Sequence, residues 1–110
     1  MTEEQRLHQL REIAKRHAKA KADREYLDHF RKSKLAMLTA ANIEEGCSSH
    51  AAAETKARTH PDYLQVLEGL RDATETSEAL FWELKIAMAG IDIWRSKAAT
   101  ERAERSGYGA

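Results

Sequence analysis

The chain has 110 residues, of which 33% are charged, and its 18 basic and 18 acidic side chains leave a net charge of zero. That balance excludes a protein drawn as a whole to nucleic acid or to an anionic membrane. A single cysteine excludes an internal disulfide, and no apolar run is long enough to cross a membrane. Few glycines, one proline and many alanines are typical of long helices, so we expect one all-α domain over residues 1–110.

The first predicted helix covers residues 3–45. Thr2 is a natural N-cap, and the acids Glu3 and Glu4 suit the positive end of a helix dipole. No proline or glycine follows until Gly46, a residue type that commonly ends helices. The opening "MTEEQRLHQL" is acidic and has no apolar core, so we expect no secretory signal there.

Two further helices are predicted after this stop. A short helix over residues 49–59 can be capped by Ser48 or Ser49. A long helix over residues 61–105 begins with a proline, which is well suited to the first helical position. We expect residues 106–110 to form a flexible tail.

The long third helix carries two apolar stripes. The main stripe repeats at spacings of three and four and comprises Tyr63, Val66, Leu67, Leu70, Ala73, Ser77, Leu80, Phe81, Leu84, Met88, Ile91 and Ala98. A second stripe, well away from the first on a helical wheel, comprises Trp82, Ile86, Ala89 and Ile93. A helix that is apolar on nearly all sides must be buried on nearly all sides.

We therefore expect a long antiparallel helical hairpin with a short connecting helix, and we expect it to self-associate into a helical bundle. One hairpin partner covers only one face of the third helix, and the short alanine-rich helix is a poor cover for the other. A second copy of the chain is the favoured cover, giving a dimer or a higher oligomer. The residues predicted at this oligomer interface are Trp82, Ile86, Ile93 and Trp94.

The stretch "AKRHAKAKADREYLDHFRKSK", residues 14–34, holds three arginines, five lysines and three acids. One interpretation is a solvated helix, because pairs such as Lys19 and Asp23 lie four residues apart and can form ion pairs. The other interpretation follows from an antiparallel hairpin, which would bring residues 1–22 beside residues 93–110. Together these segments hold ten cations and five acids, a net charge of +5. The nucleic-acid-binding residues predicted on this basic end are Arg11, Lys15, Arg16, Lys19, Arg102 and Arg105.

Catalytic and metal-binding patterns are weak. Cys47 and His50, with Glu44 and His60 nearby, provide only part of a zinc ligand set. The chain has no phosphate-cradling glycine loop and no nucleophile elbow. We expect no catalytic residue, no metal and no cofactor, and hence a protein that is not an enzyme.

Two segments, "HPDYLQVLEGLRDA" and "IDIWRSKAATERA", together with "FRKSKLAML", resemble small helical proteins encoded by tailed phages and prophages. The resemblance covers residues 26–105 and implies a place among genes of DNA replication and recombination, in the cytoplasm of a bacterial host. It implies an accessory protein that binds single-stranded DNA or a recombination protein. The alternative is a protein–protein interaction module without nucleic-acid contact, either a phage inhibitor of a host system or a virion assembly protein.

Overall fold

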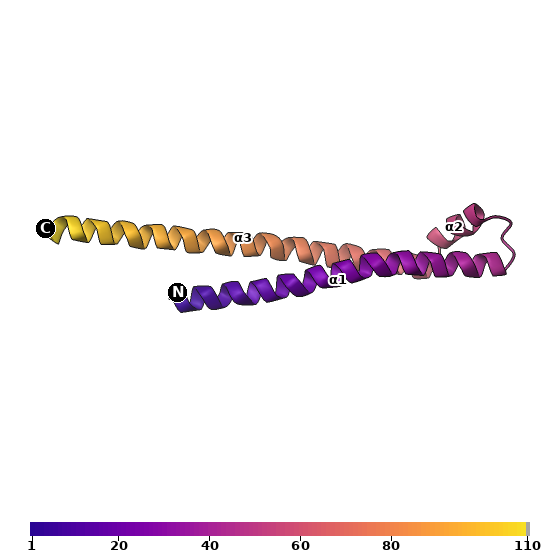
Figure 1. The fold of residues 1–110 in the computed structure, drawn as a ribbon, viewed down its shortest axis with the longest axis horizontal. Coiled ribbons are helices and arrows are strands. Elements are labelled where there is room, and N and C mark those ends of the chain that lie inside the picture. The colour runs from indigo at the N-terminus through magenta and orange to yellow at the C-terminus, as the bar shows by residue number, and fades with distance from the viewer. Residues whose placement is uncertain (110) are drawn as a thin grey trace. The chain divides into compact units, whose positions relative to one another are not determined.

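The computed structural model describes the backbone of residues 1–109 and the side chains of residues 1–107. This part of the chain forms three helices and no strand: α1 (Glu3–Glu44), α2 (His50–Arg58) and α3 (Pro61–Gly109) (Figure 1). The all-α prediction is confirmed, as is the order of a long, a short and a long helix. The predicted flexible tail over residues 106–110 is helical as far as Gly109, because serine and glycine weaken a helix without blocking its hydrogen bonds. Residue 110 lies outside the described residues.

The helix ends follow from local side-chain chemistry. At the start of α1, the Thr2 hydroxyl accepts a hydrogen bond from the Gln5 backbone N–H at 3.1 Å, and the Gln5 side chain accepts one from the Thr2 N–H at 2.8 Å. This reciprocal arrangement is a capping box. Ser49 caps α2 by accepting a hydrogen bond from the Ala52 N–H at 3.1 Å. Gly46 follows α1 with a φ of 105°, a conformation that favours glycine.

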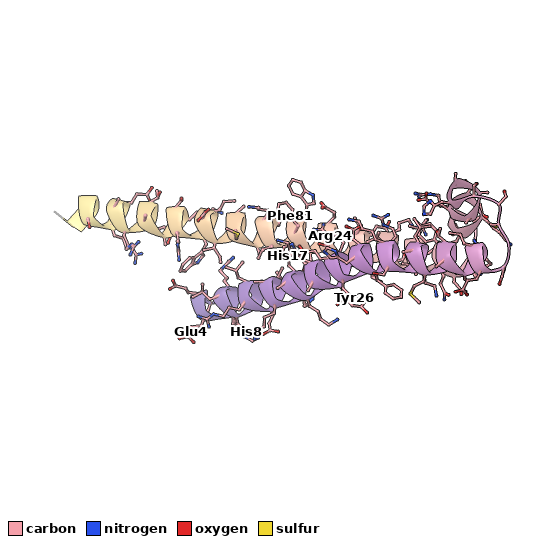
Figure 2. All side chains as sticks on the ribbon, turned by 45° about the vertical axis from the view of Figure 1, so that its right-hand side comes forward. Glu4, His8, His17, Arg24, Tyr26 and Phe81 are labelled. Carbon is pink, nitrogen blue, oxygen red and sulfur yellow. The ribbon has the colours of Figure 1, made fainter. Side chains whose placement is uncertain are left out.

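The chain divides into two compact units, and each is described by itself. The terminal unit comprises Met1–His17 and Ala79–Ala110. In it, the His17 ring lies 6.0 Å from the Phe81 ring (Figure 2), and the Arg6 guanidinium lies 6.0 Å from the centre of the Trp94 ring. Residue numbers rise along α1 as they fall along α3. The two helices are therefore antiparallel here, as the hairpin prediction requires.

The central unit, Ala18–Glu78, contains α2 and the opposite ends of the two long helices. α2 packs against the last turns of α1, where the Asn42 side chain donates a hydrogen bond to the Ala53 carbonyl at 2.9 Å. Ala53 and Ala57 are fully buried, and their small side chains allow the α2 backbone to come close. α3 begins level with Lys34, whose ammonium lies 3.9 Å from the Asp62 carboxylate.

Contact between α1 and α3 follows a heptad pattern within each unit. Among the partly or fully buried positions, one series on each helix alternates at spacings of three and four, which is typical of a coiled coil. On α1 they are Leu10, Ile13, His17, Ala20, Arg24, Leu27, Arg31, Lys34 and Leu38. On α3 they are Tyr63, Val66, Leu70, Ala73, Ser77, Leu80, Leu84, Ala87, Ile91, Trp94 and Ala98. We call these positions the seam.

The core along this seam is thin. The apolar side chains that are buried among the described residues are Ile13, Ala20, Ala53, Ala57, Tyr63 and Leu80, and three of these six are alanine. Two seam positions of α1 are instead cations that pair with acids of α3: Arg24 with Glu78 at 3.8 Å and Lys34 with Asp62 at 3.9 Å. A single copy of the chain therefore withdraws little apolar surface from water.

Candidate interaction surface

α3 is apolar on two opposite sides between residues 80 and 94. The seam side faces α1 and includes Leu80, which is 7% exposed. On the other side, Trp82 is 61% exposed, Ile86 is 71% exposed and Ile93 is 58% exposed. At about 100° per residue, these side chains and that of Ala89 fall within about 60° of one another and opposite the seam. We call Trp82, Ile86, Ala89 and Ile93 the outer face.

An aromatic cluster borders the outer face. The Phe81 ring meets the Trp82 ring edge-on, with ring centres 5.5 Å apart and an interplanar angle of 82°. This edge-to-face arrangement is favourable for aromatic pairs. The Lys85 ammonium lies 5.4 Å from the centre of the Phe81 ring, within the range of a cation–π contact. One side of the exposed Trp82 indole therefore already contacts Phe81 of the same chain.

Trp94 is the one predicted interface residue that lies away from the outer face. It occupies a seam position, is half-buried and has the Arg6 guanidinium beside its ring. Trp82 and Trp94 are twelve residues apart, so their directions differ by about 120° around the helix. Trp94 therefore belongs to the contact within the chain.

The predicted basic end does not come together in the terminal unit. Because Arg6 lies level with Trp94, the first turn of α1 is level with residues near 97 of α3. Arg102 and Arg105 thus lie beyond the start of α1, whereas Arg11 lies alongside an earlier part of α3. The prediction assumed that the two long helices end together, but α3 has 49 residues and α1 has 42.

Most predicted nucleic-acid-binding cations on α1 already have acidic partners. The ion pairs are Lys15 with Glu12 at 3.4 Å, Arg16 with Glu83 at 3.8 Å and Lys19 with Asp23 at 3.1 Å. Among the described side chains, Arg11 and Arg102 form no ion pair, and Arg105 donates a hydrogen bond to the Glu101 carbonyl at 3.4 Å. The terminal unit holds nine cations and seven acids, a net charge of +2. This is well below the +5 expected for the two segments that the sequence paired.

A further exposed apolar stripe lies on α1 in the central unit and was missed by the sequence-based reasoning. Tyr26 is 67% exposed, Phe30 is 37% exposed and Met37 is 62% exposed. The Tyr26 and Phe30 rings stack with centres 6.1 Å apart, and Figure 2 shows Tyr26 on the outer side of α1. Their spacing of four and seven residues matches that of Trp82, Ile86 and Ile93, and this spacing is the signal that the surrounding lysines and arginines obscured.

The residues considered for zinc have other roles near the connector. Within residues 1–107, no three His, Cys, Asp or Glu side chains are grouped so as to hold a metal ion. His60 instead accepts a hydrogen bond on Nδ1 from the Asp62 N–H at 3.0 Å, at the start of α3. Over the helices described, no segment has the length and apolar character needed to span a membrane.

The chain was compared with known protein families, with curated proteins and with solved structures, and none of them matches it. The chemistry of the described surface therefore carries the functional argument.

Proposed function

We propose that the protein is a self-associating helical interaction module in which the outer face of α3 binds a second copy of the chain. The observation that supports this most directly is the row formed by Trp82, Ile86 and Ile93, three large apolar side chains that are each more than half exposed. Single exposed apolar residues are common on proteins, whereas a continuous apolar row marks an interaction site. Removing such apolar surface from water favours association.

The total exposed area supports a second copy as the occupant. The chain exposes 8181 Å². A compact monomer of the same mass, 12.5 kDa, is expected to expose about 6,200 Å². The difference, about 2,000 Å², exceeds the roughly 800 Å² that each partner buries in an interface of standard size. An interface of standard size would remove part of this excess from water.

Sedimentation velocity over a range of protein concentrations tests this function. We expect a dimer or a larger species at micromolar concentrations, because the thin seam leaves folding and association linked. A well-folded monomer at tens of micromolar would contradict the proposal.

A second candidate function is contact with nucleic acid through the last turns of α3. Arg95, Arg102 and Arg105 are exposed and form no ion pair among the described side chains. Their spacings of seven and three place them on one side of the helix. Arginine suits the phosphate group because its planar guanidinium can donate two parallel hydrogen bonds. This candidate fits an accessory protein of phage DNA replication or recombination, as the resemblance to tailed-phage proteins implies.

Fluorescence anisotropy with labelled single-stranded DNA tests this candidate. Binding should weaken with salt by a logarithmic slope of about −0.7 for each phosphate contacted. Arg102→Gln with Arg105→Gln should flatten that slope by about 1.4. Lys15→Gln with Arg16→Gln is the matched control and should change it less, because both cations already pair with acids. Absence of binding at about 50 mM salt, where phosphate contacts are strongly favoured, would contradict this candidate.

A further inference from the structure

We infer that the second copy docks antiparallel on α3, with a two-fold axis that crosses the helix between Ala87 and Met88. This inference rests on the proposed self-association and specifies its geometry. Ten residues along the outer side of α3 carry it, and all ten are exposed on one continuous helix. They are Arg71, Glu75, Glu78, Trp82, Ile86, Ala89, Ile93, Lys97, Thr100 and Glu104. Their spacings are 4, 3, 4, 4, 3, 4, 4, 3 and 4 residues, which is the same series in either direction.

The symmetric spacing allows the outer side to pair with itself. In an antiparallel pair centred on this axis, Trp82 lies level with Ile93 of the second copy. Ile86 then lies level with Ala89 of the second copy. Each large side chain at the centre therefore meets a smaller one, which favours close packing of two helices. A two-fold axis repeats every contact, as an isologous dimer requires.

Charges on either side of the apolar centre are complementary in the same arrangement. Lys97 lies level with Glu78 of the second copy, and Arg71 lies level with Glu104 of the second copy. Both pairs have opposite signs, and the symmetry forms each of them twice. In a parallel dimer every residue would lie level with its own copy, so lysine would face lysine and glutamate would face glutamate. Repulsion between like charges makes that alternative unfavourable.

The existing contacts of these charged groups leave them able to pair. Arg71 is 76% exposed, and its Nε lies 3.9 Å from Asp72. Glu78 is 60% exposed, and its nearest cation, Arg24, lies at 3.8 Å. Both contacts are long and solvated, and such pairs contribute little. Among the described side chains, Lys97 and Glu104 form no ion pair at all.

The two sides of α3 also differ in period, as expected for two different partners. The seam repeats every seven residues, whereas the outer side repeats every eleven, as in the series Arg71, Trp82, Ile93 and Glu104. An eleven-residue repeat corresponds to about 3.67 residues per turn and a seven-residue repeat to 3.5. Both are close to the 3.6 of a straight helix. One helix can therefore hold α1 on one side and a second α3 on the other.

Charge reversal tests the register. In sedimentation equilibrium, Lys97→Glu should raise the dimer Kd about tenfold, because it places two pairs of like charges at the contact. Glu78→Lys should do the same, and the double variant should return the Kd to within about threefold of the unchanged chain. Lys21→Glu, a change of equal charge at an exposed position of α1, should leave the Kd unaffected. A dimer in which the double variant is no tighter than either single variant would overturn the register.

Distance measurement separates the failure of this register from the failure of self-association. With Cys47→Ser as background, a spin label at Thr100→Cys should lie about 38 Å along the helix from its copy in the antiparallel dimer, which is 25 residues at 1.5 Å each. A Thr100 separation near 10 Å, the distance between two packed helices, would overturn the antiparallel arrangement and leave self-association intact. A monomer at every concentration would overturn both.

Discussion

The double variant Ile86→Lys with Ile93→Lys is expected to sediment as a monomer at concentrations where the unchanged chain is a dimer. Each copy would bring two ammonium groups into a contact without water, and unpaired charges are costly to bury. We expect the dimer Kd to rise by about 1,000-fold or more, which corresponds to about 4 kcal/mol. Helicity should persist, because both positions are exposed in the single chain and lysine is a better helix former than isoleucine. Circular dichroism checks the fold while sedimentation equilibrium measures the Kd.

Met37→Lys is the matched control for this double variant. Met37 lies on the exposed apolar stripe of α1, together with Tyr26 and Phe30. Its side chain is 62% exposed, close to the 58% of Ile93. The substitution introduces one lysine at an exposure similar to that of Ile93, so an effect on the dimer would locate the contact on α1. If Met37→Lys dissociates the dimer while Ile86→Lys with Ile93→Lys does not, the outer face of α3 is not the interaction surface.

The features that the sequence predicted well are those decided by neighbours in the chain. Thr2 and Ser49 cap their helices with their own hydroxyl groups, and Gly46 ends α1 through its own backbone freedom. The outer face of α3 was also predictable, because exposure on one side of a helix follows from spacing alone. Such features need no knowledge of what lies across the fold.

The register of the hairpin could not be predicted in this way. The register depends on which turns of α1 contact α2 and which contact α3. Contacts between different helices determine this, such as the hydrogen bond from Asn42 of α1 to Ala53 of α2. Trp94, by contrast, could have been placed from spacing alone, because it continues the main stripe between Ile91 and Ala98; only its partner, Arg6, could not be predicted. A sequence stripe gives the direction of a side chain and leaves its partner open.

Charge pairing shows the same division between local and distant effects. The local pair of Lys19 with Asp23 forms at 3.1 Å, as predicted. Arg24 instead pairs with Glu78 of α3, and the Asp28 carboxylate accepts a hydrogen bond from Arg31 at 2.9 Å. That hydrogen bond, together with nearby cations, holds the pKa of Asp28 below its ordinary value. Cations of the basic stretch are thus partly neutralised within the chain, which weakens the case for a phosphate-binding surface on α1.

Leu80→Ala is expected to cause the largest loss of stability of any single truncation on the part of α3 that belongs to the terminal unit. Leu80 is 7% exposed, and with Ile13 it makes up the buried large apolar side chains described in the terminal unit. Truncating a buried leucine removes about 2–5 kcal/mol from the free energy of unfolding, because the lost contacts leave a cavity. In a core this thin, we expect about 3 kcal/mol, measured by urea denaturation at a fixed protein concentration.

Leu64→Ala supplies the comparison, since it makes the same chemical change on the same helix at a residue that is 47% exposed. Its loss should stay below about 1 kcal/mol. Equal losses at the two positions would show that the seam is not the core. Because binding of a second copy stabilises only the folded chain, the urea midpoint of both variants should rise with protein concentration. The urea midpoint of the Leu80→Ala protein should rise more steeply with protein concentration than that of Leu64→Ala, because a chain with a weakened seam relies on the outer face of α3 to remain folded.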